Sequence, residues 1–127
     1  MAEEFSAGEI ITKETADRDF GEVSFSLIIS SDQLKQLAAK TSKLLMFNFI
    51  NKSLVILGDD RKPLYPEETA VSAVPVFTVY SKEKVLELIK TGGDNNNFVE
   101  LRSEKLTITN GNATLEFGSF CPPWCSY

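Results

Sequence analysis

The chain has 127 residues, the length of one ordinary domain with enough mass to bury a hydrophobic core. Its hydrophobic content of 43% with 24% charged residues is typical of a globular protein. The net charge of −5 argues against a nonspecific nucleic-acid coat or a basic membrane-surface protein.

The first twenty residues are polar and acidic. The opening Met-Ala-Glu-Glu lacks the basic and apolar regions of a signal peptide, and no run approaches the roughly 18 apolar residues of a membrane helix. We therefore expect a soluble, cytoplasmic protein without a membrane partner. One strand is predicted over residues 9–12, and the following segment ETADRD has the composition of a turn or loop.

Residues 22–30 (EVSFSLIIS) predict a long strand. The segment opens with alternating apolar and serine residues, and Ile28 and Ile29 then fill both faces, as in a strand that is covered on each side.

A helix is predicted over residues 31–43. Ser30 or Ser31 with Asp32 is the expected N-cap, because a short side-chain oxygen accepts hydrogen bonds from the first-turn N–H groups. The residues expected on the buried face of this helix are Leu34, Leu37 and Ala38.

A hairpin is predicted next, from strands at 44–50 and 53–57 joined by Asn51-Lys52. Residues 58–68 (GDDRKPLYPEE) combine charge, glycine and two prolines, so we expect the main loop of the chain there.

The second half is patterned more clearly. Residues 69–80 predict one long extended segment or two strands broken at Pro75, and proline favours the break or an edge position. Ser81 is the expected cap of a helix over 82–90, and Gly92-Gly93 is expected to end that helix. Three strands follow at 98–101, 105–109 and 113–117. Asn110-Gly111 predicts a type I′ turn between the last two, because these residues tolerate positive φ angles.

The two halves match at a nearly constant spacing. Ser81 follows Ser30 by 51 residues, and one extra loop residue brings later strand positions into agreement. The matched pairs are Leu34 with Val85, Leu37 with Leu88, Ala38 with Ile89, Leu54 with Leu106, and Ile56 with Ile108. Two unrelated strand–helix–hairpin units would also align in this way, because buried faces share a period.

We therefore predict an α+β fold with a mostly antiparallel sheet and two helices. Residues 1–127 form a single domain with pseudo-repeat halves at about 20–68 and 69–120, each β-α-β-β-β, and a C-terminal tail at 121–127.

This order of elements resembles a DNA sliding clamp domain, the processivity-factor fold built from two such units. The likeness is best in residues 75–117, where PVFTVYSKEKVLELI precedes FVELRSEKLTITNGNATLEF. The resemblance implies a non-enzymatic subunit that associates with copies of itself or with a protein partner, and that holds duplex DNA against its helices without a cofactor.

The charge distribution bears on this resemblance. The windows 31–43 and 82–90 hold six lysines and three acids, whereas the remaining residues hold seven bases and fifteen acids. Lysine neutralises phosphate without reading sequence, although it is also a good helix former on any solvated face. The residues proposed to face DNA are Lys35, Lys40, Lys43, Lys82, Lys84 and Lys90.

No catalytic residues are predicted. The chain has no histidine, no Walker A pattern and no GxGxxG. An alternative hypothesis is a small-molecule-binding or enzymatic α+β domain with a pocket between helices and sheet. That pocket would be lined by Phe47, Phe49, Phe77 or Tyr80, which are also typical core residues on strands.

The C-terminal stretch FCPPWCSY leaves several possibilities open. Cys121 and Cys125 could close a small disulfide loop, but two cysteines without histidine do not complete a zinc site, and no metal is expected. Trp124 and Tyr127 could form a partner-docking tail extended by two prolines, or could fold back onto the sheet.

Overall fold

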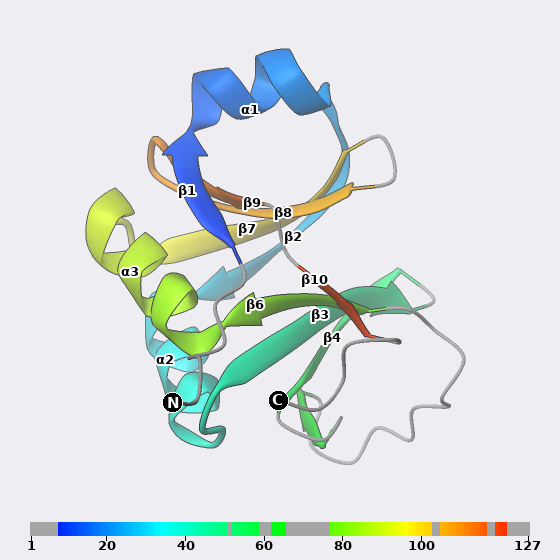
Figure 1. The fold of residues 1–127 in the computed structure, drawn as a ribbon, viewed down its shortest axis with the longest axis vertical. Coiled ribbons are helices and arrows are strands. Elements are labelled where there is room, and N and C mark those ends of the chain that lie inside the picture. The colour runs from blue at the N-terminus through cyan, green and yellow to red at the C-terminus, as the bar shows by residue number, and fades with distance from the viewer. Residues whose placement is uncertain are drawn as a thin grey trace, which may run out of the picture.

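The computed structural model describes residues 8–50, 52–58, 62–65, 77–102 and 105–116, together with the backbone of 119–121. The fold is α+β, as predicted, with two antiparallel five-stranded sheets (Figure 1). Sheet A has the order β1-β9-β8-β7-β2, and sheet B has the order β10-β6-β3-β4-β5. The elements are β1 (Glu9–Thr12), α1 (Lys13–Phe20), β2 (Val23–Ser30), α2 (Ser31–Ala39), β3 (Leu44–Ile50), β4 (Ser53–Leu57), β5 (Pro63–Tyr65), β6 (Phe77–Ser81), α3 (Lys82–Gly92), β7 (Asn96–Arg102), β8 (Lys105–Asn110), β9 (Ala113–Glu116) and β10 (Ser119–Cys121).

The two halves of the chain repeat one order of elements. β2-α2-β3-β4-β5 is followed by β6-α3-β7-β8-β9. Each half gives its first strand to the other half's sheet, because β2 pairs with β7 in sheet A and β6 pairs with β3 in sheet B. Because of this exchange, each sheet contains strands from both halves, and the two halves form one body.

The pairings also repeat in register. Equivalent pairs are Ser30–Asn96 with Ser81–Leu44, and Phe47–Ile56 with Val99–Ile108. The first N–H of each helix makes an equivalent bond, from Ser31 to the carbonyl of Asn95 at 2.8 Å and from Lys82 to the carbonyl of Lys43 at 2.9 Å. The two halves therefore share one architecture, and their origin by duplication stays a prediction.

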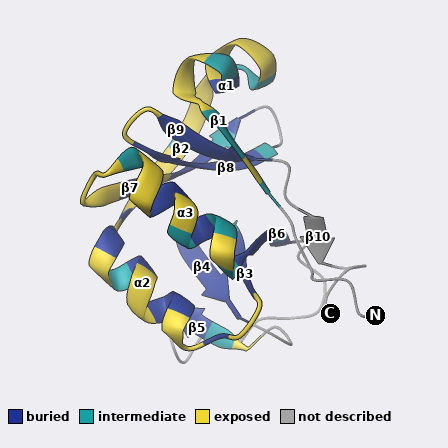
Figure 2. Cartoon of the chain, turned by 60° about the vertical axis from the view of Figure 1, so that its left-hand side comes forward, coloured by how far each residue is buried: buried dark blue, intermediate teal, exposed yellow. Residues whose placement is uncertain are grey.

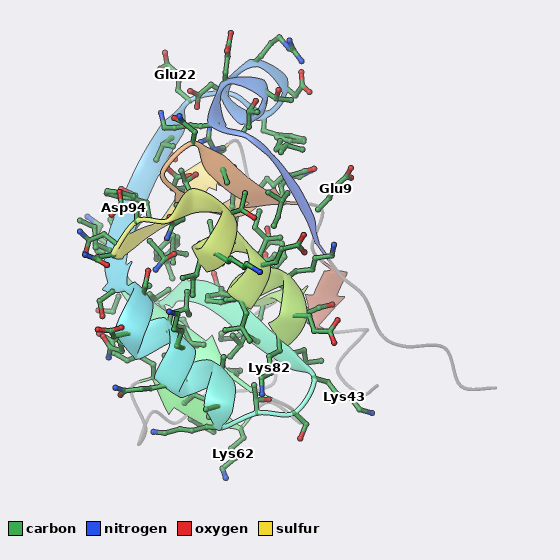
Figure 3. All side chains as sticks on the ribbon, turned by 90° about the vertical axis from the view of Figure 1, so that its left-hand side faces the viewer. Glu9, Glu22, Lys43, Lys62, Lys82 and Asp94 are labelled. Carbon is green, nitrogen blue, oxygen red and sulfur yellow. The ribbon has the colours of Figure 1, made fainter. Side chains whose placement is uncertain are left out.

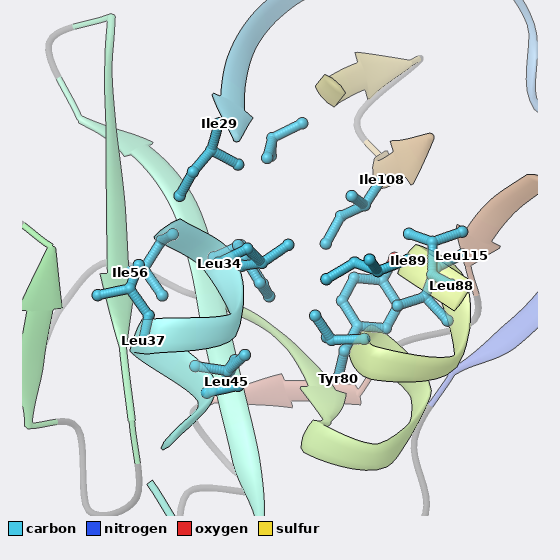
Figure 4. Close-up of a cluster of buried hydrophobic side chains, with 14 of the residues drawn as sticks. Ile29, Leu34, Leu37, Leu45, Ile56, Tyr80, Leu88, Ile89, Ile108 and Leu115 are labelled. Atoms are coloured by element: carbon cyan, nitrogen blue, oxygen red, sulfur yellow. The ribbon is translucent and has the colours of Figure 1, made fainter. Parts of the chain in front are cut away.

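The main core lies where helices α2 and α3 meet the two sheets (Figure 4). Each helix turns a buried stripe toward the sheets and an exposed side outward (Figure 2), and the buried residues are those predicted: Leu34, Leu37 and Ala38 on α2, and Val85, Leu88 and Ile89 on α3. Tyr80 of β6 is fully buried, and its hydroxyl donates to the carbonyl of Leu106 of β8 at 2.6 Å. Burial, and then the charge of Glu116, raise the pKa of Tyr80, which keeps this donor protonated.

A buried polar cluster joins α1 to the outer face of sheet A. The Arg102 guanidinium, which is fully buried, donates to Asp17 Oδ1 at 2.6 Å, to the carbonyl of Gly21 at 2.8 Å and to Glu100 Oε1 at 3.3 Å. Its Nε donates to Thr107 Oγ1 at 3.1 Å. These hydrogen bonds compensate the positive charge of Arg102, which would otherwise be costly to bury.

The segment ETADRD is helical, so the predicted loop is wrong. It lies within α1, and the Thr12 side chain caps the helix by accepting from the N–H of Thr15 at 3.1 Å. Only Ala16 of this helix is buried. The sequence therefore offers no apolar stripe from which to predict it.

Two further boundaries differ from prediction. Helix α2 ends at Ala39 with Lys40 as its C-cap, so Lys43 lies in the connection to β3 and not on the helix. Within the predicted main loop, β5 pairs with β4 and extends sheet B. The cap at Ser30, the β3–β4 hairpin and the left-handed Gly93 that ends α3 are confirmed.

The turn between β8 and β9 is shifted by one residue. Asn110 pairs with Ala113 as the last residue of β8, and the two turn residues are Gly111 and Asn112. Gly111 has φ 59°, and Asn112 is not among the residues with positive φ. The type I′ prediction is therefore wrong, since that turn requires positive φ at both central residues.

Candidate nucleic-acid interface

Helices α2 and α3 lie side by side on one side of the molecule, which faces the viewer in Figure 3. Their apolar residues are used by the core, so the outward surface of this layer is polar. The predicted lysines are distributed over it: Lys35, Lys40, Lys43 and Lys90 are exposed, and Lys82 and Lys84 are half-buried.

One group of lysines lies where the start of α2 meets the end of α3. Lys35 and Lys90 line a hollow there, together with Asp32 and Asp94. Two bases and two acids thus share this end of the helix layer. Any anion bound here would lie beside lysines that also have acidic neighbours, so this group alone is a weak phosphate site.

A second, more strongly basic group lies at the other end of the helices. Figure 3 shows Lys43, Lys62 and Lys82 together at the lower end of this side, and Lys40 and Lys62 line one hollow. The Lys82 ammonium donates to the carbonyl of Thr41 at 3.0 Å, which ties the start of α3 to the end of α2. The structure therefore brings Lys40, Lys62 and Lys82 together, although they come from three different parts of the sequence.

Lys62 was not predicted. It lies just before β5, in the segment GDDRKPLYPEE, where four acids surround two bases. Nothing in that composition separates Lys62 from its acidic neighbours. Only the pairing of β5 with β4 brings this lysine to the side of the molecule that carries the helices.

Lys84 lies beside an acid of the same helix. Its side chain is 33% exposed and lies 3.4 Å from Glu87 Oε2, one turn further along α3. An exposed pair of this kind contributes roughly 0–1 kcal/mol, so it does not hold the lysine away from a competing phosphate.

One group of exposed acids lies away from the second lysine group. Helix α1 and its flanks carry Glu14, Asp17, Asp19 and Glu22, all exposed. In Figure 3, Glu22 lies at the upper end of the molecule and Lys62 at the lower end. These acids and the second lysine group therefore lie toward opposite ends of the molecule.

The aromatic residues of the alternative hypothesis are used in packing. Phe47, Phe77 and Tyr80 are fully buried, and the rings of Phe47 and Tyr80 pack with centroids 6.1 Å apart. Phe49 is half-buried and makes an edge contact with Phe25 at 4.9 Å between centroids. This packing gives the four rings a structural role between and within the sheets.

Several sequence predictions fall outside the described residues. These are the docking residues Trp124 and Tyr127, the thiol of Cys125, residues 59–61 and 66–68 of the predicted main loop, and residues 69–76 of the predicted extended segment; of Cys121 only the main chain is described, in β10. Among the residues that the structure describes, no three His, Cys, Asp or Glu side chains are grouped so as to hold a metal ion. In the same part of the chain, no helix is long and apolar enough to cross a membrane.

No family model, curated protein or solved structure matches this chain.

Proposed function

We propose that this protein is a sliding-clamp-like, DNA-associated subunit that contacts the duplex through its helix layer. The observation that carries the proposal is the joint placement of α2 and α3 on one side of a body with two β-α-β-β-β halves, with lysines along their outward surface. A sliding contact needs charge attraction to phosphates and no base readout, and lysine supplies that attraction.

The distribution of charge supports the same function. The protein as a whole is acidic, which disfavours approach of DNA to most of its surface. The lower end of the helix side, with Lys40, Lys43, Lys62 and Lys82, is the region where several lysines converge. DNA is thereby directed to one side of an otherwise repulsive molecule.

Encircling DNA requires several copies of such a body or additional partner domains, because one domain presents only one helix layer. The proposed function therefore includes assembly with copies or with a protein partner. The exchanged first strands provide a rigid unit for that purpose, since neither half moves independently of the other.

The proposal is tested by the affinity of the protein for a fluorescent DNA duplex over a series of salt concentrations. We expect affinity to fall steeply with salt, with the logarithmic slope giving the number of phosphates contacted. The double variant Lys40→Gln/Lys62→Gln should reduce that slope by about 2, one for each lysine.

The matched control is Lys13→Gln/Arg18→Gln, which removes two exposed positive charges from α1, away from the helix layer. It should leave the slope unchanged. Equal effects of the two double variants, or no salt-dependent binding by the wild type, would contradict the proposal.

A further inference from the structure

Strand β2 forms one edge of sheet A, and it lacks the features that normally protect an edge. Natural edge strands are kept from pairing with other chains by shortness, charge, proline or bulges. β2 has eight residues, VSFSLIIS, with no charge, no proline and no glycine. Its one irregularity in pairing lies at the beginning, between Val23 and Phe25.

The other three sheet edges do have such features. β1 has four residues and carries Glu9, β5 has three and begins with Pro63, and β10 has three and is followed in the sequence by two prolines. The contrast singles out β2 as the long, neutral edge of the described structure.

The exposed apolar side chains lie at the same place. The large hydrophobic residues recorded as exposed in the described part of the chain are Val23, Ile28 and Phe98, with Ile28 at 60%. Ile28 and Phe98 are register partners on β2 and β7. The expectation that β2 is covered on both faces is therefore wrong, and the exposed apolar surface is continuous with the open edge.

The equivalent strand in the other half of the chain shows that an edge of this kind can pair with a further strand. β6 is the counterpart of β2, and its outer edge pairs with β10, which lies antiparallel opposite Phe77, Thr78 and Val79. The β2 residues 51 positions before Thr78 and Val79 are Leu27 and Ile28. Among the described residues, no strand occupies β2 at these positions. The same architecture thus carries an added antiparallel strand in one half and an open edge in the other.

We propose that the edge of β2 is an interaction surface that pairs, antiparallel and about a two-fold axis, with β2 of a second copy of this chain. In a two-fold contact residue i faces residue j and j faces i, and residues at the axis face their own copies, so an ionised side chain near the axis would face a like charge. β2 has no charge over its whole length in a chain that is 24% charged. That neutrality suits pairing with itself, and the pairing would cover Ile28 and join two copies of sheet A.

This inference does not depend on DNA binding. A two-fold contact closes on itself, so a ring of several copies would need a second and different contact.

The test is sedimentation equilibrium of the full chain over a range of concentrations, in reductant so that cysteine pairing does not contribute. We expect a reversible dimer, and Ile28→Lys should raise its dissociation constant by at least about tenfold, because it puts a lysine on each of the two paired edge strands, where charge of one sign disfavours pairing. Ser53→Lys, at an exposed position of β4, is the control with the same charge change and should leave dimerisation unaltered.

Hydrogen exchange of the same samples locates the contact. Protection of β2 amides should rise with protein concentration in the wild type and not in the Ile28→Lys variant. A chain that stays monomeric, a dimer that Ile28→Lys does not weaken, or added protection confined to other strands would overturn the proposal. A monomer that binds an added foreign peptide along β2 would overturn the choice of a second copy as the occupant.

Discussion

Arg102 is the largest fully buried side chain and has its hydrogen bonds distributed over α1, the residue after α1, and two strands of sheet A. Its closest buried carboxylate is Glu100, which also accepts from Thr107 and Thr109. A buried pair of this kind is costly to break from one side, because the remaining charge is left in an apolar setting.

We expect Arg102→Leu to lower the free energy of unfolding by about 3–5 kcal/mol, since Glu100 is then buried without a cation. Adding Glu100→Gln should restore part of that loss, because position 100 then no longer buries a charge without a cation. Urea unfolding of the two single variants and the double variant measures both effects. Additive losses in the double variant would show that the two side chains do not interact.

Asp17 gives this cluster a dependence on pH. The hydrogen bond from Arg102 lowers the pKa of Asp17 from its ordinary value of 3.8. The stability contributed by this lowered pKa is present above the ordinary value and is lost as pH falls through the folded-state value. Thermal unfolding between about pH 5 and 2 should therefore show a smaller acid-induced loss in Asp17→Asn than in the wild type, and the difference should be modest because Asp17 is exposed. Identical pH profiles would contradict this role for Asp17.

At the scale of the elements, the end of α3 is fitted against the end of β8. A Cβ on Gly92 would overlap both the side-chain and the main-chain oxygen of Asn110, whereas a Cβ on Gly93 would meet no atom within 4 Å. Gly93 instead has a left-handed φ of 69°. The two neighbouring glycines are therefore needed for different reasons, one for space and one for conformation.

These reasons predict different tolerances. Gly92→Ala should cost about 3 kcal/mol, because the obstructing atoms include main chain that does not move aside. Gly93→Ala should cost about 1 kcal/mol, and Gly93→Asn less, because asparagine tolerates the left-handed conformation. Melting temperatures and urea midpoints of the three variants check this order, and a Gly92→Ala variant as stable as Gly93→Asn would contradict the packing described.

Elements that bury apolar residues at regular spacing could be predicted from the sequence. Both helices of the repeat were found from their apolar spacing, with Ser30 confirmed as a cap. Helix α1 was missed because its residues are polar on nearly every side and only Ala16 is buried. The turn after β8 was misplaced because the Asn110 side chain is used elsewhere: it donates to Asn97 at 2.8 Å and accepts from the N–H of Asp94 at 2.8 Å.

For the whole molecule, the sequence predicted the α+β class and the spacing between the halves, but not the exchange of β2 and β6 between sheets. Strand partners depend on contacts distant in sequence, which a periodic pattern does not encode. The lysine positions followed from composition, whereas the gathering of Lys40, Lys62 and Lys82 required the fold. The open edge of β2 could not be predicted from the sequence either, because an apolar run does not show which faces of a strand are covered.

Retention of the assembled protein on a linear duplex with blockable ends tests the central claim most directly. The protein is mixed with DNA biotinylated at both ends, streptavidin is added to half of the sample, and both halves are washed in about 1 M salt to remove contacts that depend on phosphate attraction. A sliding-clamp-like assembly should remain on the blocked duplex and leave the open one. Equal loss from both would contradict encirclement of DNA by this protein.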